Sequence, residues 1–400
     1  MNKHAVIFRI CCMALTVTAM TFAIRAGILG QLASQFGLSD SELGWVNAMA
    51  FLGFPLATMF GGAIYNAIGA RRLLVVAFVG HLLGLGLTIS ADGFWGLLIS
   101  TFLIGFANGA VEAGCNPLIA ELYPDNQTTS LNRFHVWFPG GIVIGALASN
   151  MMSGVGLEWT WQVALILLPT LMYGILLQRT AFPKTATRAH STGQNVRYLF
   201  SPLYLFLVLC MTLTATTELG TQQWIERILG ASGASPMLIL ALITGLMAVG
   251  RYFAGPVVHR LKPVGVLLLS AILAASGIYL MSQVQGSMVY FAAVLFALGV
   301  TYFWPTMLGC VAEFTPKTGA LGMSLLGGAG MFAVSWWNPV IGGWIDAARQ
   351  SAADLPAEQA QMLAGQQVLQ NLLLFPLVLI VAFAGLYWFM AQRRKQVAPV

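Results

Sequence analysis

The stretch from Gly105 to Gly141, GFANGAVEAGCNPLIAELYPDNQTTSLNRFHVWFPGG, decides how this chain folds. It places an acid, Glu112, within a run of apolar and small residues, with Asn108 and Asn116 four residues to either side. Residues spaced by four lie on one face of a helix, so these three side chains form a polar stripe. Because an ionisable group at membrane depth is costly, it faces a cavity or a partner. The stretch therefore predicts a membrane helix that lines a cavity.

The composition indicates an integral membrane protein. Of the 400 residues, 58% are hydrophobic and 8% are charged, whereas an ordinary soluble domain carries about 25% charged residues. The net charge of +6 is spread over short loops, which favours a role in membrane orientation over nucleic-acid binding. The five cysteines lie in apolar runs without metal-ligand spacing. No phosphate-binding loop or catalytic motif occurs, so we expect no enzyme activity, no metal and no cofactor.

The apolar runs divide the chain into two halves. A membrane helix needs about 20 mostly apolar residues. Twelve such runs occur, at 7–29, 43–65, 72–91, 95–118, 131–154, 161–179, 202–226, 235–258, 263–283, 287–314, 318–345 and 370–391. The polar segment 180–201 separates six runs from six. We therefore expect an all-α protein with an N-terminal six-helix bundle (1–179), a cytoplasmic linker (180–201) and a C-terminal six-helix bundle (202–400).

The basic residues predict the orientation. With the N-terminus inside, 16 of the 19 Lys and Arg residues, Arg251 among them, fall on cytoplasmic segments, and Arg25, Arg227 and Arg349 stay outside. By the positive-inside rule, both termini are cytoplasmic in a multi-pass protein of the cell's inner (plasma) membrane. The second and eighth runs each end in a Gly-rich helix and a basic turn, which indicates a parallel duplication of six helices.

Two acids lie deep in the apolar runs, Glu112 and Glu218. Glu112 is the candidate for proton coupling, because burial favours its neutral form and makes reversible protonation accessible; the alternative is a structural carboxyl satisfied by its neighbouring amides. Glu218 shares a helix face with Gln222, and Arg25 occupies a similar depth in the first run. A gate formed by Arg25 and Glu218 is one interpretation, and an Arg25 that reaches the membrane interface is the other.

Further polar and aromatic side chains are candidates for solute binding. Carboxyls, amides and aromatic faces suit a neutral polyhydroxylated ligand, because amides bond its hydroxyls and rings cover its C–H faces. For the tryptophans, an interfacial belt is the alternative role. The predicted solute-binding residues are Asn108, Asn116, Asn132, His135, Trp137, Glu218, Gln222, Trp224, Trp304 and Asn338.

The segment Glu112-Ala-Gly-Cys-Asn116-Pro117 resembles the E-x-x-x-N-P pattern of the fucose–galactose–glucose:proton symporter family, a branch of the major facilitator superfamily. Leu131-Asn132 and Gly140-Gly141 resemble that family's next helix, and Phe303-Trp304-Pro305-Thr306 and the stretch 339–346 resemble its tenth and eleventh spans. The resemblance implies the major facilitator fold, a proton-coupling role for Glu112, and cavity positions for Asn116 and Asn132.

The chain departs from this pattern at two places. The region Ile24-Arg25-Ala26-Gly27-Ile28 lacks the acid that the family's sugar–proton symporters have in the first span, and Asn66 stands where the superfamily usually has Asp. Coupling to a proton, coupling to sodium and uncoupled transport therefore all stay open.

The leading interpretation is a secondary active transporter that moves a sugar or sugar-like polar solute by alternating access, with proton symport. The alternatives are an exporter of amphipathic compounds and a membrane sugar receptor that does not transport. The expected partners are the solute, the proton and the lipid bilayer, and we expect a monomer.

Overall fold

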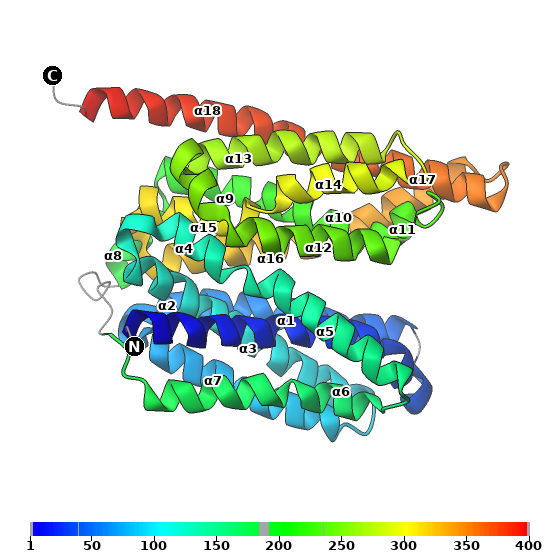
Figure 1. The fold of residues 1–400 in the computed structure, drawn as a ribbon, viewed down its shortest axis with the longest axis horizontal. Helices are drawn as coiled ribbons and strands as arrows, with labels where there is room; N and C mark the ends of the chain where they lie inside the picture. The colour runs from blue at the N-terminus through cyan, green and yellow to red at the C-terminus, as the bar shows by residue number, and fades with distance from the viewer. Residues whose placement is uncertain (1–2, 39, 184–191, 235, 398–400) are drawn as a thin grey trace. The chain divides into compact units, whose positions relative to one another are not determined.

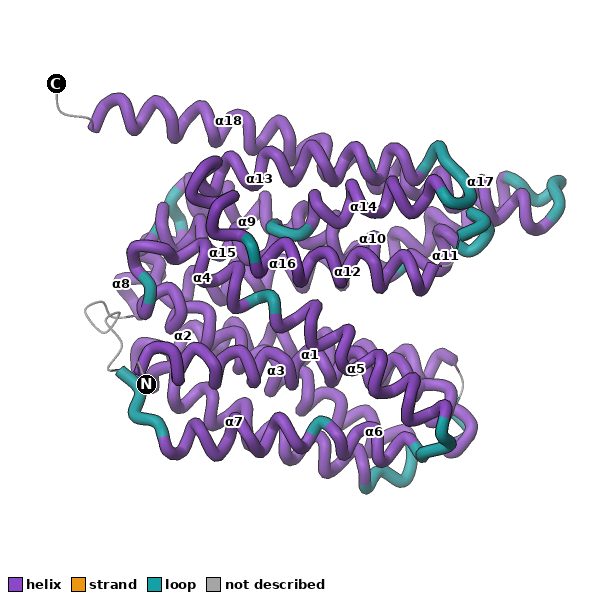
Figure 2. The backbone as a smooth tube through the Cα atoms, viewed as in Figure 1, coloured by secondary structure: helices purple, strands orange, loops and turns teal. Residues whose placement is uncertain are grey.

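The computed structural model describes residues 3–38, 40–183, 192–234 and 236–397 (Figure 1). Within these residues the chain is helical, with short connecting loops and no strand (Figure 2). The all-α prediction is therefore confirmed. Helices suit an apolar chain of this kind, because a helix satisfies its own backbone hydrogen bonds where no water is present.

The internal contacts divide the chain into two compact units. Unit 1 comprises Met1–Leu205 and Val311–Gly328, and unit 2 comprises Phe206–Cys310 and Ala329–Val400. The boundary after Leu205 lies close to the end of the expected linker. The segment Val311–Gly328 comes from the second half of the sequence, yet it belongs to the first unit. The division into two six-helix bundles joined by 180–201 stays a prediction.

Unit 1 is built from the helices of the first half. They are α1 (Lys3–Phe36), α2 (Asp40–Ile89), α3 (Phe94–Leu122), η1 (Pro124–Asn126), α4 (Gln127–Phe134), α5 (Trp137–Gly154), α6 (Trp159–Leu165), α7 (Leu167–Arg179) and α8 (Thr192–Leu199). The segment from the second half adds the end of α15 (Phe303–Phe314), η4 (Pro316–Thr318) and the start of α16 (Gly319–Ser351).

Unit 2 holds the remaining helices. They are most of α9 (Pro202–Ala215), η3 (Thr216–Gly220), α10 (Thr221–Gln223), α11 (Ile225–Leu229), α12 (Pro236–Tyr252), α13 (Ala254–Met281), α14 (Met288–Val300), the start of α15, the rest of α16, α17 (Ala357–Leu372) and α18 (Leu374–Val397).

The twelve expected membrane helices are all accounted for. Among the described residues, ten helices are long and apolar enough to cross a membrane. One of them, Ala48–Ile89, covers both the second and the third expected runs, and the shorter apolar helix Leu238–Tyr252 covers the eighth. Many large apolar side chains are exposed on these helices, as helices in contact with lipid require.

Two matching turns divide long helices in the two halves. α2 breaks at Gly69, with φ 76° and ψ 165°, and α13 breaks at Lys262, with φ 62° and ψ 160°. Both turns fall where the sequence has its two basic turns after Gly-rich helix ends. A positive φ costs glycine little, whereas lysine adopts it under strain. The same backbone turn thus recurs in both halves, as a duplication predicts.

Close packing against α2 sets the rotation of α3. A Cβ atom added at Gly105 or Gly109 would overlap with backbone atoms of α2, and Ala113 occupies the space beside Gly61. These three positions of α3 are spaced by four, so they form one helix face. Glu112 precedes Ala113 by one residue, so the polar stripe lies next to this packed face. The close contacts between α3 and α2 therefore fix the direction in which Glu112 points.

Candidate functional site

Glu112, Asn116 and His135 form a buried polar cluster in unit 1. Glu112 and Asn116 lie one turn apart on α3, and His135 follows the last residue of α4. All three are nearly inaccessible, with exposed fractions of 5%, 5% and 2%. The side-chain amide of Asn116 donates to Glu112 Oε2. His135 Nε2 lies 3.1 Å from Asn116 Oδ1 and 4.0 Å from Glu112 Oε2.

The chemistry of the three groups orients their hydrogen bonds. Asn116 Oδ1 can only accept, so His135 Nε2 carries a hydrogen and donates it. The amide of Asn116 then donates to the carboxyl of Glu112. The acid therefore has a donor at one oxygen whether it is neutral or charged, and an imidazole within reach. Such an arrangement lets a buried acid change its protonation state without being left unsatisfied.

The neighbouring candidates on α4 and α5 are Asn132 and Trp137. Asn132 turns back along its own helix, and its Nδ2 donates to the carbonyl of Thr128 over 2.9 Å. The side chain of Trp137 is 43% exposed. Of the residues that the sequence grouped here, the structure brings together Glu112, Asn116 and His135.

Asn108 belongs to a different buried chain of hydrogen bonds. His81 Nε2 lies 2.8 Å from Asn108 Oδ1, and His81 Nδ1 lies 2.9 Å from the hydroxyl of Tyr173. Asn108 Nδ2 donates to Thr21 Oγ1, which donates to the carbonyl of Thr18. The partners favour a neutral His81 that donates from Nε2 and accepts from Tyr173. Both ends of the Asn108 amide are thus engaged, so a role in solute binding stays a prediction.

Arg25 is buried on α1 one turn beyond Thr21. Its guanidinium carbon lies 5.0 Å from the centre of the Phe22 ring, a cation–π distance. Together with Thr21, Thr88 and Thr101 it lines a small cavity of about 30 Å³ inside unit 1.

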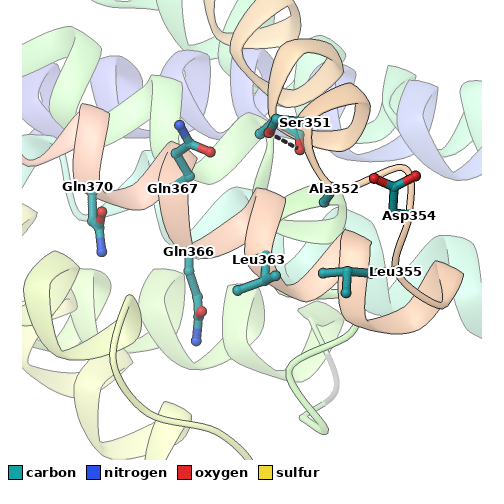
Figure 3. Close-up of a pocket in the computed structure, with 9 residues that line it drawn as sticks. Ser351, Ala352, Asp354, Leu355, Leu363, Gln366, Gln367 and Gln370 are labelled. Atoms are coloured by element: carbon teal, nitrogen blue, oxygen red, sulfur yellow. Dashed lines mark hydrogen bonds between the residues drawn. The ribbon is translucent and has the colours of Figure 1, made fainter.

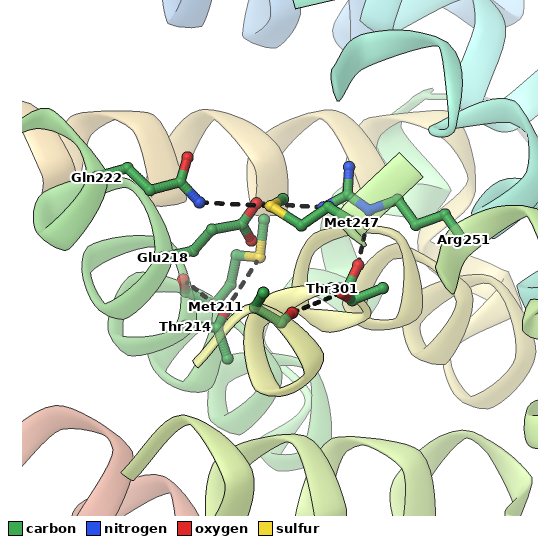
Figure 4. Close-up of polar contacts among 8 residues, drawn as sticks. Met211, Thr214, Glu218, Gln222, Met247, Arg251 and Thr301 are labelled. Carbon is green, nitrogen blue, oxygen red and sulfur yellow. Dashed lines mark hydrogen bonds and ion pairs between the residues drawn. The ribbon is translucent and has the colours of Figure 1, made fainter. Parts of the chain in front are cut away.

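Glu218 and Arg251 form a buried ion pair in unit 2 (Figure 4). Arg251 Nη2 lies 3.1 Å from Glu218 Oε1, and Arg251 Nε donates to the carbonyl of Thr301 over 2.6 Å. The exposed fractions are 4% for Glu218 and 2% for Arg251. The second oxygen, Glu218 Oε2, has no hydrogen-bond partner among the described residues. Glu218 lies in η3, a single turn of π-helix, a feature that is frequent at functional sites.

This ion pair gives Arg251 a buried partner that the sequence did not predict. The sequence analysis counted Arg251 among the cytoplasmic basic residues, because it lies near the end of the eighth run. The structure buries its side chain on α12 beside Glu218. Glu218 thus has a partner in its own unit, other than the Arg25 that the sequence suggested. Matching depth in the first and seventh runs motivated the pairing of Arg25 with Glu218, and that gate stays a prediction.

The other candidates of unit 2 are dispersed around this pair. Gln222 Nε2 lies 3.4 Å from the sulfur of Met247, one turn beyond Glu218 (Figure 4). Trp224 is half-buried, and Trp304 is half-buried against Gly330. Asn338 lies on α16, but its side chain is outside the described residues. Their role in solute binding stays a prediction.

A separate polar cavity of about 570 Å³ lies between the end of α16 and α17 (Figure 3). Its lining includes Gln366, Gln367, Gln370 and Asp354. Figure 3 shows Gln366 and Gln370 pointing to one side of α17 and Gln367 to the other. These amides do not converge on one point, so the buried clusters are the stronger candidates for the functional site.

The sequence analysis did not predict a role for two buried residues, His81 and Arg251. Both lie within apolar runs that were expected to cross the membrane, at 72–91 and 235–258. An ionisable side chain inside such a run indicates a buried partner. Applied to every run, this rule identifies both residues, although it does not identify their partners.

Comparison with known proteins places the chain in a family. The family model of the Major Facilitator Superfamily matches residues 11–337. A D-xylose transporter of Levilactobacillus brevis is 28% identical over 148 residues, 36% of this chain and 32% of that protein's length. A 3-(3-hydroxy-phenyl)propionate transporter of Escherichia coli (strain K12) is 27% identical over 299 residues, 68% of this chain and 71% of that protein.

Solved structures share the fold at low sequence identity. The crystal structure of the E. coli fucose:proton symporter matches with a TM-score of 0.74 and 16% identity, over 94% of this chain and 99% of that chain. A proton:xylose symporter matches with a TM-score of 0.73 and 16% identity, over 95% and 96%. Because the family model covers most of the chain and the relatives are named as transporters, the chain belongs to the Major Facilitator Superfamily of multi-pass membrane transporters.

Proposed function

We propose that this protein is a secondary active transporter that moves a sugar-like, polyhydroxylated solute together with a proton. The observation that carries the proposal is the buried cluster of Glu112, Asn116 and His135 in unit 1. The fold shared with a fucose:proton and a proton:xylose symporter supports it.

Glu112 is the proton carrier in this proposal. Ionisation of a carboxyl at this depth is costly unless donors surround the charge. Asn116 supplies one donor, and His135 at 4.0 Å can supply a second after a small movement. The free energies of the ionised and protonated forms of Glu112 thus become similar, as reversible proton binding by a carrier requires. Alternating access then exposes the acid to each side of the membrane in turn.

The amides and aromatic rings are the proposed ligands of the solute. In unit 1 these are Asn116, Asn132, His135 and Trp137, and in unit 2 they are Glu218, Gln222, Trp224, Trp304 and Asn338. Glu218 Oε2 supports this assignment, because in the described part of the chain it is a buried acceptor without a donor, which favours a ligand that brings a hydroxyl.

One observation favours a second candidate, the uptake of an aromatic carboxylic acid. The relative that matches over 68% of this chain is named as a 3-(3-hydroxy-phenyl)propionate transporter. Arg25 is buried in unit 1 and lines a small cavity, and a guanidinium is the preferred protein partner of a carboxylate. The small volume of that cavity, about 30 Å³, weighs against this second candidate, because an aromatic acid would not fit beside Arg25.

A ligand screen followed by transport tests both candidates. The purified protein is heated with a panel of monosaccharides, disaccharides and hydroxylated aromatic acids, because a ligand of the folded state raises the unfolding temperature. The strongest stabilisers are then offered to proteoliposomes with and without an inward proton gradient. We expect a sugar to stabilise the protein and to accumulate only with the gradient. Accumulation of an aromatic acid alone would select the second candidate, and ligand binding without flux would indicate a receptor.

A further inference from the structure

α4 is a short helix whose start lacks the usual side-chain cap. It has 8 residues, and its N-cap residue Asn126 makes no side-chain capping hydrogen bond. Helices of this length are marginal in isolation, because few backbone bonds offset the cost of forming the first turn. Contacts at its two ends therefore decide how firmly α4 is held.

The carboxylate of Glu313 occupies the empty capping position. Both the backbone N–H and the hydroxyl of Thr128 donate to Glu313 Oε1, at 3.3 Å and 2.6 Å. Thr128 lies in the first turn of α4, where N–H groups have no partner within the helix and where the helix dipole favours a negative charge. Glu313 stands near the end of α15, in the part of the second half that belongs to unit 1.

Hydrogen bonds at both ends of α4 lie between this cap and the proton site. The carbonyl of Thr128 accepts from Asn132 Nδ2 over 2.9 Å. At the other end of α4, the backbone N–H of His135 donates to the carbonyl of Leu131 over 2.9 Å, and its ring contacts Asn116. Asn116 in turn donates to Glu112. A helix of two turns moves as one body, so a contact at its start affects the residue at its end.

We propose that Glu313 is a positioning residue: by capping α4 it holds His135 against Asn116 and thereby links the state of Glu112 to the packing of segment 311–328 against the first-half helices of unit 1. The capping itself does not depend on the proposed function, whereas its consequence for proton coupling does. Because coupling between two sites is reciprocal, a change in the protonation of Glu112 also changes how firmly Glu313 is bound.

Other contacts hold the segment independently of Glu313. Asn195 Nδ2 donates to the carbonyl of Lys317 over 2.7 Å, and the hydroxyl of Tyr204 donates to the carbonyl of Gly322 over 2.8 Å. Loss of the Glu313 carboxylate therefore leaves the segment docked. A substitution at Glu313 consequently tests the cap on α4 rather than the folding of unit 1.

Hydrogen exchange of the full-length protein tests the cap. We expect Glu313→Ala to speed the exchange of the amides in 127–135 about fivefold, the factor that corresponds to a typical helix cap. Glu313→Gln keeps a neutral acceptor and should fall between Glu313→Ala and the wild type. Asp125→Ala is the matched control, because it removes an exposed acid of the same charge just before α4. Unchanged exchange in Glu313→Ala, or an equal rise in Asp125→Ala, would overturn the proposal.

Chemical modification of His135 tests the positioning. Diethyl pyrocarbonate reacts with neutral imidazole, and peptide mass spectrometry reports each histidine separately. In the wild type we expect slow labelling of the buried His135 and fast labelling of the exposed His259. Glu313→Ala should speed labelling of His135 several-fold and shift its pH profile, with partial recovery in Glu313→Gln and no change at His259. Identical His135 profiles in the wild type and in Glu313→Ala would refute the link. Neither experiment needs a solute. Both therefore test the role of Glu313 even if the proposed transport function is wrong.

Discussion

Removal of the cation from the buried ion pair of unit 2 should strongly destabilise the protein. In Arg251→Met a shorter, flexible apolar side chain replaces the side chain that carries the guanidinium. Glu218 would then keep its burial but lose the partner at 3.1 Å, and its other oxygen already has no partner among the described residues. An acid without a donor would stand in the interior of the unit.

The size of the effect follows from the burial of both partners. Exposed ion pairs contribute about 0–1 kcal/mol, whereas removal of one partner from a buried pair costs about 3–5 kcal/mol. With exposed fractions of 4% and 2%, Glu218 and Arg251 belong to the second group. Glu218 can take up a proton and so relieve part of the cost. We therefore expect a loss near 3 kcal/mol, on the order of a hundredfold in the unfolding equilibrium constant.

Unfolding of the detergent-solubilised protein, followed at two pH values, measures this loss. Arg260→Met is the control, because Arg260 is an exposed arginine further along the same part of the chain. The loss in Arg251→Met should shrink as the pH falls, since a neutral Glu218 needs no cation. The double variant Glu218→Leu with Arg251→Met should be more stable than Arg251→Met alone. A loss no larger than that of Arg260→Met, or one that grows toward acid, would refute the reasoning.

Three further predictions test the fold and the orientation. Lys262 has φ 62° and ψ 160°, so Lys262→Gly should relieve strain and raise the unfolding free energy by about 1 kcal/mol; a lower unfolding temperature would contradict this. His81→Phe leaves the hydroxyl of Tyr173 without its acceptor and should lower the unfolding free energy by roughly 2 kcal/mol, part of which the added change Tyr173→Phe should restore; equal stability of the single and double variants would argue against this. Cysteines placed at Arg197 and Asp354 of a cysteine-free variant should react with impermeant maleimide from opposite sides of the membrane, and labelling of both from one side would overturn the orientation.

Local patterns in the sequence were sufficient for the helices and for the acid cluster. Apolar runs of membrane length recover the twelve membrane helices, because in lipid the hydropathy of a segment and its structure are directly linked. The spacing of four between Glu112 and Asn116 places both on one helix face, and the short polar turn that follows brings His135 back beside them. These contacts are close in the sequence, so a local pattern reveals them.

The contacts that the sequence did not reveal join distant residues. Thr128 and Glu313 are separated by 185 positions, and His81 and Tyr173 by 92. Such pairs depend on how the helices pack, which no local pattern reports. The partner of Arg251 was missed for a related reason: a cation near a helix end can face either the interior or the solvent, and the choice depends on a partner from another helix.

The proton-carrying role of Glu112 is the central claim, and one pair of transport measurements tests it most directly. Glu112→Gln mimics the protonated acid, and it preserves the shape of the side chain and an acceptor for Asn116. We expect proteoliposomes with this variant to exchange labelled solute for unlabelled solute at close to the wild-type rate. The same vesicles should fail to accumulate solute when an inward proton gradient is imposed, whereas wild-type vesicles accumulate it. Gradient-driven accumulation that persists in Glu112→Gln would contradict the account and leave Glu112 as a ligand for solute hydroxyls.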